Sequence, residues 1–123
     1  MKYDLKKQIY SFSYAWKGIA HGFCREQNLR FHLCVALLTV VAGWGVGISR
    51  MEWIAVILCI GGVIAAELMN SAIERVVDLA SPTLHPLAGQ AKDLAAGAVL
   101  VTAIAAVIVG IVIFLPYLTR FLL

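Results

Sequence analysis

Three long apolar segments restrict this chain to a single kind of fold. They run over about 31–48, 53–79 and 94–117, in a sequence of 123 residues that is 62% hydrophobic and only 14% charged. A helix that crosses a hydrocarbon core of about 30 Å needs roughly 20 mainly apolar residues. Only helices or closed barrels satisfy their backbone hydrogen bonds within lipid. The sequence therefore predicts an all-α membrane protein with three transmembrane helices.

The residues before the first span have a different pattern. Large apolar side chains recur at alternating three- and four-residue steps, at Ile9, Phe12, Trp16, Ile19 and Phe23. This spacing predicts an amphipathic helix over about 4–25 that lies at the membrane interface. Residues 26–32 then alternate polar and apolar side chains, which predicts a bend before the first span. With no repeat or second domain in view, residues 1–123 are expected to form one domain.

The distribution of basic residues predicts how the chain is oriented. Most of them precede the first span or lie between the second and third, and only Arg50 and Arg120 fall on the other side. Cytoplasmic loops carry the excess of Lys and Arg in membrane proteins. The N-terminus and the 75–93 connection should thus be cytoplasmic. The excess of basic residues, a net charge of +3, is explained by this orientation. No nucleic-acid partner is expected.

Four polar side chains form a stripe along the inner half of the second span. Glu67, Asn70, Glu74 and Asp78 are offset by three, seven and eleven positions, which keeps them within roughly an 80° sector of a helix. Glu67 lies fourteen residues inward of Trp53, or about 21 Å at 1.5 Å per residue. A charged side chain this deep costs at least about 2.5 kcal/mol, so it usually has a function. The stripe could bring a lipid hydroxyl and a soluble phosphate donor together.

The stripe belongs to a longer motif that resembles a known family. The segment 67–74, Glu-Leu-Met-Asn-Ser-Ala-Ile-Glu, is followed by Val77-Asp78 and by Gly-Gln-Ala-Lys-Asp at 89–93. With Tyr-Ala-Trp-Lys-Gly at 14–18 and with Glu26, it resembles the bacterial diacylglycerol kinase and undecaprenol kinase family, in order along nearly the whole chain. The resemblance implies a homotrimer in the bacterial cytoplasmic membrane that shares active sites between subunits. It implies transfer of the γ-phosphoryl group of ATP to a lipid hydroxyl, with Mg²⁺.

The resemblance also implies roles for individual residues. Glu67 would be the general base for the lipid hydroxyl, Asn70 would orient it, and Glu26 and Glu74 would hold Mg²⁺. The nucleotide would be bound by Lys7, Tyr14, Glu26, Glu74, Asp78, His85, Gly89, Lys92 and Asp93. The lipid substrate would meet Glu67, Trp16, Asn28 and Arg30.

The lipid expected from the resemblance is undecaprenol. Residues 26–32 resemble the polyprenol-kinase members of the family, and Ala96 stands where diacylglycerol-specific members tend to have a serine. Diacylglycerol is the alternative substrate.

Other interpretations of the stripe are open at the level of sequence. Glu67 and Glu74 could form interhelical ion pairs, for example with Arg30 or Lys92. An intramembrane glutamate in an oligomer is also used by proton-coupled transporters and channels. A non-catalytic adaptor could use the stripe only to assemble subunits. Neither of the last two functions requires the cytoplasmic residues Glu26, Lys92 and Asp93.

Overall fold

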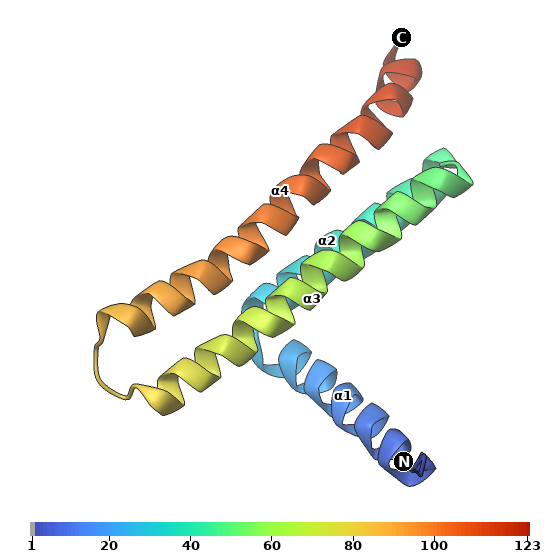
Figure 1. The fold of residues 1–123 in the computed structure, drawn as a ribbon. Coiled ribbons are helices and arrows are strands. Elements are labelled where there is room, and N and C mark those ends of the chain that lie inside the picture. The colour runs from blue at the N-terminus through green and yellow to red at the C-terminus, as the bar shows by residue number, and fades with distance from the viewer. Residues whose placement is uncertain (1) are drawn as a thin grey trace.

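The computed structural model describes residues 2–123, which form helices joined by short connections (Figure 1). They are α1 (Leu5–Arg25), α2 (Gln27–Val46), α3 (Arg50–Ala80) and α4 (Pro86–Leu122). The last three are long and apolar enough to cross a membrane. The prediction of an all-α membrane protein with an N-terminal amphipathic helix and three spans is confirmed.

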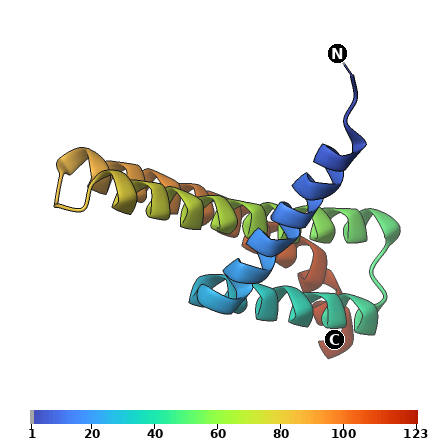
Figure 2. The ribbon, with the colours of Figure 1, turned by 90° about the horizontal axis from the view of Figure 1, so that it is seen from below.

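The helices differ in how closely they pack. α3 and α4 lie antiparallel and share the most contacts, and α2 packs beside α3. α1 leaves this bundle at a steep angle and touches it only near its C-terminal end (Figures 1 and 2). Most large apolar side chains of α2, α3 and α4 are exposed in the single chain. Such a surface fits a lipid environment or contact with further subunits.

The helix ends follow from local sequence signals. α2 ends at Val46 because Gly47 adopts the left-handed conformation, with φ of 70°, two residues before the predicted end of the span. Ser49 and Glu52 form a capping box at the start of α3, which satisfies free backbone N–H groups. Pro86 is the first residue of α4, as expected for proline at a helix start.

The bend between α1 and α2 is sharper than predicted. It is confined to Glu26, with φ of −102° and ψ of 116°, and α2 already begins at Gln27. Leu29 is fully buried where α1, α2 and α3 meet. A Cβ atom on Gly22 would lie 2.8 Å from Leu29 Cδ1 and 2.9 Å from Leu68 Cδ2, so the glycine allows this close approach. The alternating pattern of residues 26–32 thus reflects the burial of Leu29 within a helix, and not an extended bend.

A hydrogen bond joins the start of α3 to the last part of α4, at the ends of these helices that lie away from their connection. The Tyr117 hydroxyl donates to Glu52 Oε1 over 2.7 Å, and the Ser49 N–H donates to the same oxygen over 2.9 Å. Beside it, Ile48, Val56 and Ile113 form a buried apolar cluster. This contact fixes the register of the two longest helices.

Replacing Tyr117 with phenylalanine is expected to lower the thermal unfolding temperature in detergent by a few degrees. The ring is retained, but the Glu52 carboxylate loses its hydroxyl donor. The matched control is Tyr10→Phe, which removes a hydroxyl from the exposed surface of α1 and should leave the unfolding temperature unchanged. Equal unfolding temperatures for Tyr117→Phe and the unmodified protein would contradict this role.

Candidate active site

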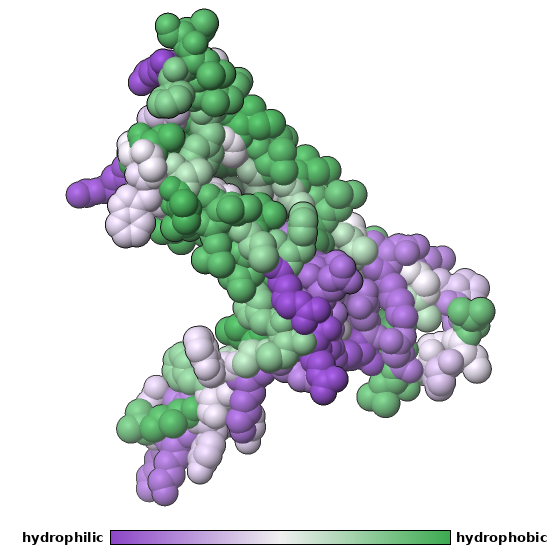
Figure 3. All heavy atoms as spheres, turned by 180° about the vertical axis from the view of Figure 1, so that it is seen from behind, coloured by the Kyte–Doolittle hydropathy of each residue, from purple (hydrophilic) through white to green (hydrophobic). Residues whose placement is uncertain are grey.

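The polar stripe on α3 is buried at its first two residues and more exposed at its last two. Glu67 is 2% exposed and Asn70 is 7% exposed, whereas Glu74 is half-buried and Asp78 is exposed. Burial therefore decreases from the middle of the span towards the α3–α4 connection. Hydrophilic side chains gather towards that end of the molecule, and apolar side chains dominate the middle of the bundle (Figure 3).

Glu67 has no cationic partner within the described chain. The salt bridges found among residues 2–123 join Arg75 to Glu26 and Lys92 to Asp78. The Arg30 guanidinium donates to the backbone oxygen of Cys24. The ion pairs considered for Glu67 and Glu74 with Arg30 or Lys92 are thus not formed in the single chain. A buried carboxylate without a counterion is a candidate functional group.

Asn70 connects Glu67 to the part of the stripe that is nearer the α3–α4 connection. Its Nδ2 atom lies 3.5 Å from Glu74 Oε1, a long hydrogen bond. Its Oδ1 atom is buried and has no hydrogen-bond partner among residues 2–123. Buried polar atoms are rarely left unpaired in native structures. This unpaired oxygen makes Asn70 a candidate functional residue of the stripe.

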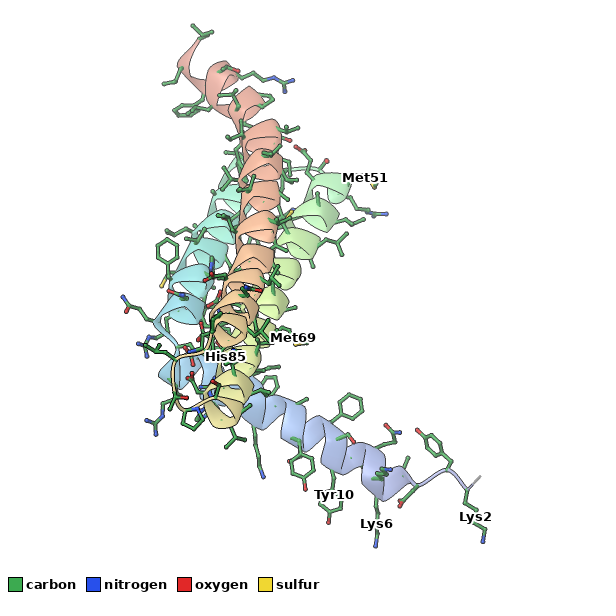
Figure 4. The ribbon with its side chains drawn as sticks, turned by 60° about the vertical axis from the view of Figure 1, so that its left-hand side comes forward. Lys2, Lys6, Tyr10, Met51, Met69 and His85 are labelled. Carbon is green, nitrogen blue, oxygen red and sulfur yellow. The ribbon has the colours of Figure 1, made fainter. Side chains whose placement is uncertain are left out.

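A pocket of about 500 Å³ lies at the α3–α4 connection. Its lining includes four predicted nucleotide-binding residues: Asp78, His85, Gly89 and Lys92. The volume falls within the range of small-molecule sites, and Figure 4 shows His85 at this turn. The His85 ring accepts a hydrogen bond from the Leu87 N–H over 3.1 Å, which caps α4. The pocket brings these four residues together, and their binding of a nucleotide stays a prediction. Asp93 is exposed and lies outside the pocket lining.

Lys92 lies in the pocket before the apolar segment that begins at Leu94. The hydrogen bond from its ammonium group to the Asp78 carboxylate raises the pKa of Lys92. The lysine is therefore charged at neutral pH. An ammonium group can bind phosphate oxygens, but in the single chain this charge is paired with the Asp78 carboxylate in the same pocket.

Glu26 approaches α3 from the bend between α1 and α2. Its carboxylate forms a salt bridge of 2.7 Å with Arg75, the neighbour of Glu74 in sequence. No group of three or more His, Cys, Asp or Glu side chains suited to a metal occurs in the described residues. Mg²⁺, however, is commonly bound by one or two carboxylates together with substrate phosphates. The carboxylates of Glu26 and Glu74 are hard oxygen donors of the kind that this ion takes.

The remaining predicted residues are not brought to the site in the single chain. Lys7, Tyr14 and Trp16 are exposed on α1, which diverges from the bundle, and the labelled Lys6 and Tyr10 side chains point into open space there (Figure 4). Asn28 and Arg30 are exposed in the first turn of α2. α1 meets the other helices only at its C-terminal end, so its outer residues cannot reach the pocket of their own chain.

An apolar groove of about 380 Å³ lies between α2, α3 and α4. On α3 it is lined by Val56, Ile60 and Val63, which share the helical face of Glu67 at three- and four-residue steps. The lining of the groove on α3 ends at Ile64, one helical turn before the buried Glu67. A hydroxyl at Glu67 could have its hydrocarbon chain in this groove.

Sequence reasoning missed Arg75 as a member of this region. Arg75 was used only to assign the orientation of the connection, yet its side chain reaches Glu26, 49 residues away. It stands directly after Glu74, beside the stripe. The signal available in the sequence was the position of Arg75, a cationic residue directly beside the acidic residues of the stripe.

The three candidate spans are those of a membrane protein, and comparison with known proteins gives its class and family. Residues 13–114 match the family described as prokaryotic diacylglycerol kinase. The chain is 44% identical to the undecaprenol kinase of Bacillus subtilis over 115 residues, which cover 94% of each protein. It is 35% identical to the diacylglycerol kinase of Escherichia coli K12, covering 81% of this chain and 82% of that protein. The chain belongs to the prokaryotic diacylglycerol kinase family and is a lipid kinase, not a channel or an adaptor.

Proposed function

We propose that this protein transfers the γ-phosphoryl group of ATP to the hydroxyl of undecaprenol, giving undecaprenyl phosphate. The observation that carries the proposal is Glu67, a buried carboxylate without a counterion. It lies one helical turn beyond Ile64, which lines an apolar groove. A pocket suited to phosphates lies farther along the same helix. A lipid alcohol and a soluble nucleotide would meet between the two.

The proposed reaction assigns a task to each part of the stripe. Glu67 accepts the proton of the lipid hydroxyl while the hydroxyl oxygen forms a bond to the γ-phosphorus, and the bond to ADP breaks. Asn70 orients the hydroxyl through its free Oδ1 atom. Glu26 and Glu74 would hold Mg²⁺, which neutralises charge on the phosphates. Lys92, in the cytoplasmic pocket, adds positive charge for the nucleotide.

Two features favour undecaprenol over diacylglycerol as the substrate. The relative in Bacillus subtilis, 44% identical over 94% of each chain, is named an undecaprenol kinase. Residues 26–32 and Ala96 have the sequence pattern expected of polyprenol kinases. The apolar groove near Glu67 suits the hydrocarbon chains of either lipid. Diacylglycerol is the second candidate, because relatives in Escherichia coli and Synechocystis are named diacylglycerol kinases.

The proposal includes the assembly and its placement in the cell. We place residues 1–123 as one domain in the bacterial cytoplasmic membrane, with the N-terminus and the active site on the cytoplasmic side. A homotrimer with shared sites is supported by the exposed apolar faces of α2 to α4. It is also supported by the distance of Lys7 and Tyr14 from the pocket of their own chain, since a neighbouring subunit could supply them.

A labelling experiment tests the substrate. The purified protein in phospholipid vesicles is given ATP with a radiolabelled γ-phosphate, Mg²⁺, and equal surface fractions of undecaprenol or diacylglycerol. Undecaprenol should be labelled faster, and the label should disappear when Mg²⁺ is chelated. Faster labelling of diacylglycerol would overturn the substrate preference, and labelling of neither lipid would overturn the proposed function.

A further inference from the structure

A salt bridge connects the bend between α1 and α2 to α3. Arg75 Nη2 lies 2.7 Å from Glu26 Oε1, and Arg75 Nη1 donates to the backbone oxygen of Ser71 over 3.1 Å. The guanidinium is therefore held at two points, one on its own helix and one on the bend. Because the guanidinium is planar and rigid, this arrangement fixes the direction from which it meets Glu26.

Glu26 has no other structural task for its side chain. It is the residue before α2, at the N-cap position, yet its carboxylate makes no capping hydrogen bond. Its backbone N–H donates to Gly22 O over 2.8 Å and closes α1 without help from the side chain. The carboxylate is instead directed to α3, next to the stripe that contains Glu74.

We propose that Arg75 is a positioning residue that holds Glu26 ready to bind Mg²⁺. The proposal rests on the proposed function, in which Glu26 is a ligand of this ion. Arg75 contacts Oε1, which leaves Oε2 available to the metal. Carboxylates that bind metals are commonly oriented by a hydrogen bond from an outer residue. Fixing the long glutamate side chain in advance also reduces the conformational entropy lost when the metal binds.

The geometry favours this role over competition between Arg75 and the metal. An arginine that neutralises a carboxylate usually makes two parallel hydrogen bonds, one to each oxygen. Here the second nitrogen of the guanidinium is used by Ser71 O, and only one carboxylate oxygen is engaged. Glu26 and Arg75 are both partly exposed, at 27% and 49% of their side chains, so solvent and a hydrated ion can reach them.

The test measures Mn²⁺ binding as well as activity. Full-length protein in nanodiscs is titrated with Mn²⁺ and a non-hydrolysable ATP analogue, and free Mn²⁺ is measured by electron paramagnetic resonance. Arg75→Gln should weaken Mn²⁺ binding about tenfold, the lower end for loss of an outer partner of a metal ligand. The KM for Mg²⁺ should rise by a similar factor, while kcat at saturating Mg²⁺ stays near that of the unmodified protein.

Two variants separate positioning from general effects of charge or folding. Arg75→Lys retains the charge and should recover part of the Mn²⁺ affinity. Arg25→Gln removes a neighbouring exposed cation that forms no salt bridge in residues 2–123, and it should bind Mn²⁺ like the unmodified protein. In a Glu26→Gln background, Arg75→Gln should have no further effect, because the group that it positions is already lost.

Several results would overturn the inference. Unchanged or tighter Mn²⁺ binding by Arg75→Gln would show that Arg75 has no role or that it competes with the metal. A further loss of affinity in the Glu26→Gln background would show that Arg75 acts by another route. An equal loss for Arg25→Gln would indicate a general charge effect. Absence of lipid labelling by the unmodified protein would refute the proposed function instead, since the Mn²⁺ measurements do not depend on lipid turnover.

Discussion

Glu67→Gln is expected to reduce lipid phosphorylation at least about 100-fold, the smaller end of the usual effect of removing a general base. The amide has nearly the same shape but cannot accept the proton of the lipid hydroxyl. Nucleotide binding should be retained, because the pocket at the α3–α4 connection does not include this residue. Turnover is measured with radiolabelled ATP, and nucleotide binding with a fluorescent ATP analogue.

The matched control for this variant is Glu52→Gln. It removes a carboxylate from the opposite end of the same helix, where the side chain contacts Tyr117 and not the stripe. This variant should phosphorylate lipid at the unmodified rate under conditions in which it stays folded. If Glu67→Gln retained more than a tenth of the activity, a contribution below the usual range for a general base, Glu67 would not be the base.

Glu74→Gln should lower the affinity for Mg²⁺–ATP about tenfold or more, the range expected when a metal site is disturbed. Lipid phosphorylation should fall with it. The loss has two causes: the carboxylate that would bind Mg²⁺ is removed, and Asn70 loses its contact with Glu74 Oε1. The effect on binding distinguishes Glu74 from Glu67, whose replacement should affect turnover alone. A calorimetric titration with Mg²⁺ at a fixed nucleotide concentration measures the Mg²⁺ affinity of each variant.

The control for Glu74→Gln is Asp4→Asn, a change at an exposed acid that caps α1 far from the pocket. It should leave Mg²⁺–ATP affinity unchanged. Equal losses of nucleotide affinity in Glu67→Gln and Glu74→Gln would show that the two carboxylates do not have separate roles.

The spans and the stripe could be predicted from sequence because both depend on local periodicity. The three long apolar segments placed the ends of α2 and α3 to within about four residues. α4 begins eight residues before the predicted start at 94 and ends five residues after the predicted end at 117, because an apolar segment marks the span and not the whole helix. The spacing of Glu67, Asn70 and Glu74 put them on one face of α3, and the structure has them buried or half-buried on that face. These properties are determined within a few turns of one helix.

Other features depend on contacts between residues far apart in sequence and could not be predicted. The sharp bend at Glu26 depends on Leu29 packing beside Gly22 and Leu68. The bridge from Arg75 to Glu26 joins residues 49 positions apart. The positions of Lys7 and Tyr14 relative to a nucleotide depend on surfaces beyond the single chain, and their role stays a prediction.

The length of α3 sets the depth at which the proposed chemistry takes place. Its 31 residues extend about 46 Å at 1.5 Å per residue, well beyond a hydrocarbon layer of about 30 Å. Glu67 and Glu74 lie in the same uninterrupted helix, which fixes the distance between their backbone positions. A thicker bilayer would therefore draw Glu67 farther below the lipid headgroups, whereas a thinner one would lift it towards water. In the proposed mechanism, a mismatch between the length of the span and the thickness of the bilayer therefore changes how readily the lipid hydroxyl reaches Glu67.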